Sequence, residues 1–304
     1  MTRTRRLAIG LAMNAGLVVT QVALGLVARS AGLLADAGHN LTDVGALALS
    51  IVAVRMALRP PDAQRSFGNH RATILAALAN ASMIAVVTLL IVIQSAYRFG
   101  HPEHVRAGVV VIVASLGLVV NGIAALVLRD GTADLNMRSA VLHMVGDALA
   151  SLAVIMGAVG LLFLPSAAWL DPVSALVVAA IIVYQASGIL RSSITVLLES
   201  TPSDVDLTEL TATMEEMPGV GEVHDLHVWS LSSEMRLLSA HMVLTGHPSL
   251  EEAQAVGDQV KAMIAASFSI AHSTLELECE RCNDEDEDPC AMEPATAVPR
   301  GRHD

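Results

Sequence analysis

The stretch SAGLLADAGHNLTD at residues 30–43 decides the fold of this chain, because it places charged side chains inside an apolar segment. Asp36, His39 and Asp43 all fall within a run of residues that is long enough to cross a bilayer. Charged groups inside a membrane are costly, and those that occur usually face a cavity and have a function. The stretch therefore predicts a membrane-spanning helix that carries a polar site.

The composition extends this interpretation to the first two thirds of the chain. The 304 residues are 53% hydrophobic and 16% charged, with a mean hydropathy of +0.57, which is too apolar for a soluble enzyme of this size. A bilayer-spanning helix needs about 20 apolar residues. Six segments reach this length, at residues 7–28, 33–58, 72–97, 107–128, 141–164 and 172–190. We expect an all-α bundle of six transmembrane helices.

The arginines predict the orientation of the bundle, because positively charged connections stay in the cytoplasm. Ten arginines flank the spans on the side of the N-terminus, and only Arg29, Arg98 and Arg106 lie on the other side. Both termini are therefore expected in the cytoplasm. The apolar run at 7–28 is longer than the roughly 7–15 residues of a signal-peptide core, so it is not read as a cleaved leader. The lack of a targeting segment and the short loops favour the inner membrane of a bacterial cell.

The charge is divided unequally along the chain. Residues 1–198 contain 13 arginines and eight acidic residues, whereas residues 199–304 contain five basic and 22 acidic residues. This balance excludes a nucleic-acid-binding protein, which would present a basic face. The three cysteines all lie within 279–290, which excludes a secreted disulfide scaffold. A basic membrane part is thus joined to an acidic soluble part.

The acidic part has its own pattern of elements. Two segments show helical spacing and three are strand-like. In chain order they are residues 204–217, 223–231, 235–244, 249–267 and 273–278. The order α-β-β-α-β predicts a compact α+β domain of the ferredoxin-like type. We expect the transmembrane domain at 1–198, this cytoplasmic domain at 199–280 and an acidic disordered tail at 281–304.

Two of the six spans contain the motif His-x-x-x-Asp. It occurs at His39 and Asp43 in the second span and at His143 and Asp147 in the fifth. A step of four residues places both side chains on one helix face, so two facing helices would bring two imidazoles and two carboxylates to one point. This set suits a tetrahedral Zn²⁺ ion. The alternative is a pair of separate His–Asp hydrogen bonds that hold helices together.

The charges of this set favour a transported ion. One divalent cation neutralises two carboxylates, and protons must replace that cation when it leaves. Imidazole titrates near neutral pH and must be neutral to bind a metal, so metal and protons compete for the same atoms. The competition predicts a metal/proton antiporter. Imidazole ligands favour Zn²⁺ over Mg²⁺ and Ca²⁺, with Cd²⁺, Co²⁺ and Ni²⁺ as further candidates.

The remaining polar residues of the spans receive less specific interpretations. Asn14, Gln21, Asn80 and Asn121 are expected to form hydrogen bonds between helices. Asp36 is either a carboxylate at the mouth of a cavity or a residue of the helix start.

Several stretches resemble the cation diffusion facilitator family of zinc transporters. They are residues 30–43, FGNHRATILAALANA at 67–81, LNMRSAVLHMVGD at 135–147, DPVSALVV at 171–178, LLESTP at 197–202, VHDLHVWSL at 223–231, LSAHMVL at 238–244 and HSTLELE at 272–278. The resemblance covers residues 7–280. It implies a homodimer with one transport site in each protomer, alternating access and cytoplasmic domains that pair. It also implies that His39, Asp43, His143 and Asp147 are the four transport ligands.

The resemblance further implies a metal site in the cytoplasmic domain. His224, His241 and Glu278 match this site, where Zn²⁺ would act as a regulatory ligand in addition to being the substrate. Cys279 and Cys282 follow at once, and they either extend the site or form a solvated pair of reduced thiols. The acidic domains would then pair when metal is bound, or they pair through apolar strand faces regardless of metal.

Three further histidines are less informative. His70 and His272 resemble positions at which some relatives hold a metal between the membrane and cytoplasmic domains, and otherwise they are exposed loop histidines. His227 is expected to pack within its sheet.

Competing classes of function are separated by the motifs. A membrane-embedded zinc hydrolase needs an open metal position and a general base, as in H-E-x-x-H, and this sequence has no such motif, so we expect no enzyme. A channel is disfavoured because a four-ligand site binds too tightly for fast permeation. The leading prediction is a secondary transporter that exports Zn²⁺ in exchange for protons. The alternative is a membrane-anchored zinc sensor, which would not need His-x-x-x-Asp pairs in its spans.

Overall fold

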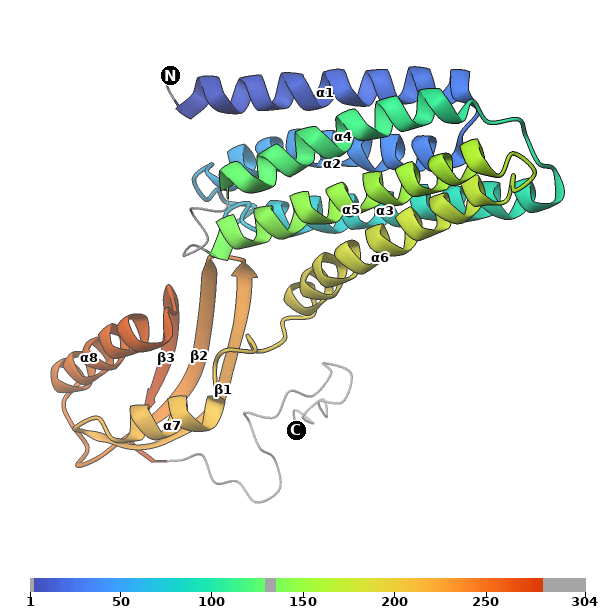
Figure 1. The fold of residues 1–304 in the computed structure, drawn as a ribbon. Helices are drawn as coiled ribbons and strands as arrows, with labels where there is room; N and C mark the ends of the chain where they lie inside the picture. The colour runs from blue at the N-terminus through green and yellow to red at the C-terminus, as the bar shows by residue number, and fades with distance from the viewer. Residues whose placement is uncertain (1–2, 129–134, 281–304) are drawn as a thin grey trace, which may run out of the picture. The chain divides into compact units, whose positions relative to one another are not determined.

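The computed structural model describes residues 3–128 and 135–280 (Figure 1). The described chain divides into two compact units, with the division between Ile194 and Thr195. Each unit is described by itself. The expected acidic tail at 281–304 lies outside the described residues.

The first unit is a bundle of six long helices, as the apolar segments predict. They are α1 (Arg3–Ala28), α2 (Ala31–Ala57), α3 (Ala72–Gly100), α4 (Ala107–Leu128), α5 (Leu135–Phe163) and α6 (Leu170–Leu197). Successive helices run in opposite directions (Figure 1), so the bundle has two ends. We call one the 58–71 end, after the connection between α2 and α3, and the other the Arg29 end, after the connection between α1 and α2.

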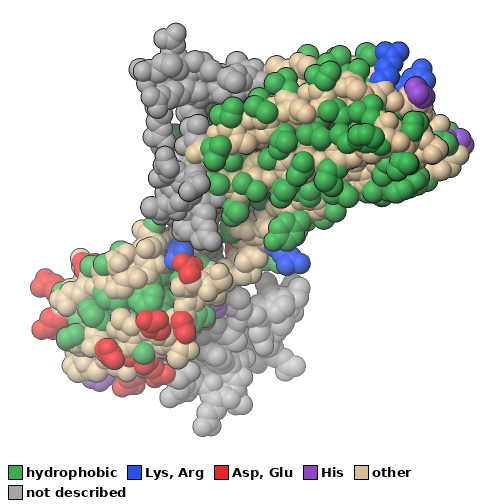
Figure 2. All heavy atoms as spheres, viewed as in Figure 1, with side chains coloured by type: hydrophobic (Ala, Val, Ile, Leu, Met, Phe, Trp, Pro, Cys, Tyr) green, Lys and Arg blue, Asp and Glu red, His purple; other side chains and the backbone are tan. Residues whose placement is uncertain are grey.

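The apolar surface of this unit fits a bilayer. Within the described residues, α2, α3, α5 and α6 are each long and apolar enough to cross a membrane, and α1 and α4 contribute shorter apolar stretches at Gly16–Ala28 and Ala107–Ile123. Figure 2 shows hydrophobic side chains over most of the visible face of the bundle. Leu90, Ile112 and Tyr184 are examples, each more than half exposed. In water such a surface would be unfavourable, whereas in lipid it is matched.

Small residues let the helices of the bundle approach closely. A Cβ atom added at Gly157 of α5 would lie 2.9 Å from the Cβ of Ser174 and 3.2 Å from the carbonyl oxygen of Leu170, both on α6. Only glycine leaves room for this contact. Such close packing is the usual basis of helix association in lipid, where the hydrophobic effect gives no net driving force between helices.

A buried carboxylate joins three helices at the Arg29 end. Asp171, in the first turn of α6, is 4% exposed. It accepts hydrogen bonds from the hydroxyl of Ser30, which caps α2, and from the backbone N–H of Ala31 at 2.6 Å. Arg98 near the end of α3 lies 3.1 Å from Asp171 and also donates to the carbonyl oxygen of Arg29. The carboxylate therefore satisfies the start of α2 and neutralises a buried guanidinium.

The second unit is an α+β domain with the predicted order of elements. It contains α7 (Leu207–Glu215), β1 (Val220–Ser232), β2 (Met235–Leu244), α8 (Leu250–Phe268) and β3 (His272–Glu278). The sheet order is β1-β2-β3, with β1 and β2 antiparallel and β2 and β3 parallel. Ser249 and Glu252 form a capping box at the start of α8, and their hydrogen bonds hold the pKa of Glu252 below its ordinary value.

The hydrophobic core of this domain lies between the sheet and its two helices. Leu210 and Met214 of α7 and Val260 of α8 are fully buried, and they pack with alternate residues of the strands, such as Met242. The residues between these core positions point to the opposite face of the sheet, since side chains alternate along a strand. His241, next to Met242, is therefore on the face that the helices leave open.

The Asp171 junction generates a stability prediction. Asp171→Ala should lower the free energy of unfolding by about 3–5 kcal/mol, because it leaves the buried Arg98 guanidinium without a counter-charge. The midpoint of thermal unfolding of the purified protein in detergent measures the change. Glu103→Ala is the matched control, since Glu103 lies 3.9 Å from the same guanidinium but is 45% exposed, and it should unfold like the wild type. Equal midpoints for Asp171→Ala and the wild type would contradict this role.

Candidate metal sites

The two His-x-x-x-Asp motifs meet between α2 and α5. His39 and Asp43 lie on α2, and His143 and Asp147 lie on α5. His39 and Asp147 are 3% exposed, Asp43 is 18% exposed and His143 is 37% exposed. The four side chains expected from the sequence thus converge at one place inside the helix bundle.

The spacing of the ligand atoms matches a tetrahedral ion. The Nε2 atom of His39 lies 3.0 Å from Asp147 and 3.6 Å from Asp43, and the Nε2 atom of His143 lies 3.4 Å from Asp43 and 3.7 Å from Asp147. Zn²⁺ bound at 2.0–2.1 Å by four ligands would place neighbouring ligand atoms about 3.3 Å apart. His39, Asp43 and Asp147 each offer one ligand atom within 4.8 Å of the others, whereas His143 faces the second oxygen of Asp147 and must move closer to complete a set of four.

The charge at this place is balanced by imidazoles alone. Within the described part of the chain, the ion pairs of Asp43 and Asp147 are formed with His39 and His143 and with no lysine or arginine. Imidazole is charged only when it is protonated, so the two carboxylates need either protons or a metal cation to be neutralised.

Asp36 differs from both expectations for it. It lies in the second turn of α2 and is 0% exposed, so it is neither at the mouth of a cavity nor at the helix start. Its Oδ2 atom accepts hydrogen bonds from Gln21 of α1 at 2.8 Å and from Ser151 of α5 at 3.3 Å. Asn40 in turn donates to Gln21. The prediction of an interhelical hydrogen bond is confirmed for Gln21, and the side chain of Asn14 lies outside the described residues.

A cavity of about 500 Å³ adjoins the four ligands and extends in one direction only. Its lining includes His39, Asp43 and His143, then Ser50 further along α2 and Ile189 further along α6. Both helices run toward the 58–71 end, so the cavity extends from the ligands toward that end. On the other side of His39, α2 is almost continuously buried from Ala31 onward, which closes the site toward the Arg29 end.

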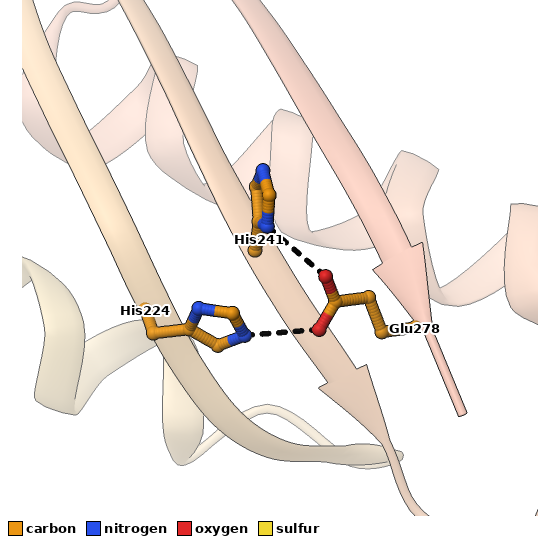
Figure 3. Close-up of side chains that lie close together, drawn as sticks. All are labelled: His224, His241 and Glu278. Atoms are coloured by element: carbon orange, nitrogen blue, oxygen red, sulfur yellow. Dashed lines mark hydrogen bonds and ion pairs between the residues drawn. The ribbon is translucent and has the colours of Figure 1, made fainter. Parts of the chain in front are cut away.

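The cytoplasmic domain holds a second cluster on the open face of its sheet. His224 of β1 lies 2.9 Å from one oxygen of Glu278, and His241 of β2 lies 3.0 Å from the other (Figure 3). The three residues come from three adjacent strands, and each offers one ligand atom within 4.8 Å of the others. The register of the strands explains why these side chains meet. His224 pairs with His241, and Glu278 pairs with Val243, which is two residues after His241 in β2. The predicted cytoplasmic ligands are therefore brought together.

Two acidic residues of this cluster were missed by the sequence reasoning. Asp225 lies 3.6 Å and Glu276 lies 3.4 Å from the Nε2 atom of His241. Strand alternation would place Asp225 on the face opposite to His224. A bulge in β1 between His224 and His227, with Asp225 at φ 47°, turns its side chain toward the histidines. For Asp225 the only signal in the sequence is an acidic residue directly after His224. For Glu276 the signal is its spacing of two residues from Glu278, which places both side chains on one face of β3.

The other candidate residues are placed as follows. His227 is exposed and bonded to Asp225, so the prediction that it packs within the sheet is wrong. Cys279 is exposed, and Cys282 lies outside the described residues. His70 precedes α3 in the first unit, whereas His272 begins β3 in the second, and the metal predicted between them stays a prediction.

Comparisons with known proteins agree with both halves of the molecule. A family model described as the cation efflux transmembrane domain matches residues 7–198, and one described as the cytoplasmic domain of cation efflux proteins matches residues 202–280. Together they cover both units of the structure.

Relatives match nearly the full length of the chain. The metal cation efflux system protein CzcD of Cupriavidus metallidurans is 35% identical over 285 residues, which are 93% of this chain and 89% of the relative. The zinc transporter ZitB of Escherichia coli is 34% identical over 93% of this chain and 90% of the relative. A cadmium, cobalt and zinc/H(+)-K(+) antiporter of Bacillus velezensis is 30% identical over 98% and 95%. A solved metal-bound C-terminal domain of CzcD, 36% identical, covers 24% of this chain and 99% of that domain, with a TM-score of 0.23.

The cytoplasmic cluster generates a binding prediction. His241→Ala in full-length protein that also carries Asp43→Ala and Asp147→Ala should bind Zn²⁺ at least about tenfold more weakly, because a ligand is lost while the membrane site is already disabled. Equilibrium dialysis of the detergent-solubilised protein measures the affinity. The control is His247→Asn in the same Asp43→Ala and Asp147→Ala background. His247 is an exposed turn residue with φ 49°, a backbone conformation that Asn tolerates. Equal affinities in these two variants would remove His241 from the site.

Proposed function

The chain belongs to the cation efflux family of metal transporters, and from this premise we propose that it exports Zn²⁺ from the cytoplasm in exchange for protons. Efflux of metal cations across a membrane is the activity that the family establishes. The proposal adds the ion, the counter-ion and the site. The site consists of His39, Asp43, His143 and Asp147.

The single observation that carries this proposal is the convergence of two imidazoles and two carboxylates inside the bundle. Separations of 3.0–3.7 Å between imidazole nitrogens and carboxylate oxygens suit a tetrahedral ion with two N and two O ligands. Hard cations such as Mg²⁺ and Ca²⁺ prefer more ligands, all of them oxygen. Zn²⁺ is thus the favoured substrate, with Cd²⁺, Co²⁺ and Ni²⁺ as secondary substrates.

Charge balance supports the exchange with protons. The bound divalent cation neutralises Asp43 and Asp147, and its departure leaves two carboxylates within a membrane-spanning segment. Protons that bind the same four side chains restore a tolerable charge. In each transport cycle, the metal-free site then returns to the cytoplasmic side with protons bound, which couples zinc efflux to proton influx.

The direction of transport rests on the arginines and on the cavity. Of the three arginines at the Arg29 end, Arg98 is buried and paired with Asp171, so it does not act as a free positive charge. The excess of arginines at the 58–71 end therefore supports a cytoplasmic location for that end and for both termini. With this orientation, the cavity leads from the cytoplasm to the four ligands.

The acidic domain supports regulation by the transported ion. Cation efflux proteins dimerise, and two copies of a segment with 22 acidic and five basic residues would repel each other. Zn²⁺ bound by His224, His241 and Glu278 would lower this repulsion and favour paired domains. Efflux would then rise when cytoplasmic zinc is high.

The role of the carboxylates can be tested in proteoliposomes. Asp147→Ala should reduce zinc transport to the level of empty vesicles, because one remaining carboxylate no longer balances a divalent charge. Zinc accumulation is followed with and without an imposed pH gradient, and Glu103→Ala serves as an acidic control outside the site. Wild-type rates in Asp147→Ala would refute the site. A wild-type zinc flux that is the same with and without the pH gradient would refute proton exchange. Zinc binding without any flux would favour the alternative function of a membrane-anchored zinc sensor.

The role of the imidazoles in selectivity has a separate test. His143→Asp should keep transport but widen it toward Mn²⁺, since an oxygen ligand replaces a softer nitrogen ligand. Competition of Mn²⁺ with Zn²⁺ uptake is compared in the variant and the wild type. An unchanged order of metals would show that His143 does not set the preference.

A further inference from the structure

Two residues with carboxamide side chains line the cavity that leads to the transport ligands. They are Asn80 of α3 and Gln185 of α6, on helices that contribute none of the four ligands. Asn80 lies two turns from the start of α3 at the 58–71 end, so it stands on the approach to the site. Neither residue has a role in the metal set described above.

The carboxamide oxygens of both residues are buried without a partner. The Oδ1 atom of Asn80 and the Oε1 atom of Gln185 accept no hydrogen bond from any described residue. The interhelical hydrogen bond expected for Asn80 is therefore not made by this oxygen. A buried acceptor without a donor is unfavourable, because it has lost its hydrogen bonds to water and gained none in return. Both oxygens are closed to a water-sized molecule as the side chains stand, so each amide must rotate to turn its acceptor toward an occupant of the cavity that supplies donors.

The backbone of α5 fixes the position of the Gln185 amide. Gly146 lies between His143 and Asp147, and a Cβ atom added there would collide with the amide group of Gln185. Any residue other than glycine would push the amide away. The side chain of Gln185 is thus set against α5 one residue before a transport ligand.

The chemistry of the approaching ion supplies the missing donors. A divalent cation enters from the cytoplasm with bound water, and these water molecules are strong hydrogen-bond donors because the cation polarises them. Amide oxygens accept such bonds without adding negative charge to a site that already holds two carboxylates. They can hold a partly hydrated ion while its waters are exchanged for His39, Asp43, His143 and Asp147.

We propose that Asn80 and Gln185 form a subsite for the partly hydrated divalent cation, which the ion occupies before it reaches the four transport ligands. The inference rests on the proposed function and deepens it. The subsite acts during loading of the site from the 58–71 end. It should therefore affect how readily the ion is captured and leave the later steps of the cycle unchanged.

The test compares the concentration dependence of zinc uptake in proteoliposomes. Asn80→Leu and Gln185→Leu remove the acceptors but keep a side chain of similar size. Each should raise the KM for Zn²⁺ about tenfold, as expected for losing one hydrogen bond to a charged group, with a maximal rate within about twofold of the wild type. Gln185→Asn retains an uncharged acceptor in the cavity and should have a KM below that of Gln185→Leu.

A matched control and a binding measurement separate this role from a structural one. Asn121→Leu removes an amide that is also buried with an unpartnered atom among the described residues, but Asn121 does not line the cavity, so its KM should stay at the wild-type value. Equilibrium zinc affinity of each solubilised variant should also equal that of the wild type, since the four ligands are intact.

The outcomes distinguish the two proposals. If the wild type transports Zn²⁺ and both leucine variants keep its KM, the subsite is refuted and the proposed function stands. If the leucine variants lose maximal rate or equilibrium affinity instead, the amides serve the structure of the bundle and the subsite is again refuted. If the wild type does not transport Zn²⁺, the proposed function itself fails.

Discussion

The bundle is organised around two carboxylates that have no permanent cation beside them. Asp43 and Asp147 meet between α2 and α5, and in the described residues only imidazoles pair with them. Such a pair is tolerable within a membrane-spanning segment only when protons or a metal ion neutralise it. This requirement accounts for the polar side chains within the largely apolar lining of the cavity, which must give water and ions a path to the carboxylates. Histidine suits the proposed role of the other ligand, since imidazole gives up its proton under conditions in which a metal can bind.

The Arg29 end of the bundle solves the opposite problem. There a carboxylate and a guanidinium are both buried and lie 3.1 Å apart, so each is neutralised by the other and by backbone groups. Asp171 takes hydrogen bonds from the first turn of α2, where N–H groups have no partner within the helix. The two polar regions thus have different consequences. The charges at the Arg29 end are satisfied by the protein itself, whereas those of the proposed transport site must be satisfied by protons or by the transported ion.

The sequence alone predicted most of this architecture, because its strongest signals are local. The lengths of the apolar segments placed the six helices within seven residues of their observed ends, and a step of four residues brought His39 and Asp43 to one helix face. Features that depend on contacts between distant segments were not predicted. The structural role of Asp171 was not predicted, and the residue was named only as part of a motif, because its partners lie at the start of α2 and on α3. Asp225 needed a bulge to turn toward His241, and the position of Gln185 depends on a glycine of another helix.

The junction at Asp171 has a mechanical consequence for α2. A helix rises 1.5 Å per residue, so the 27 residues of α2 extend about 40 Å from the junction to the 58–71 end. If the junction acts as a fixed pivot, a tilt of about 5° moves the far end of α2 by about 3.5 Å, more than the diameter of a water molecule. His39, only eight residues from Ala31, moves by about 1 Å in the same tilt. A helix held in this way can widen or narrow the mouth of the cavity while the proposed metal ligand His39 hardly moves.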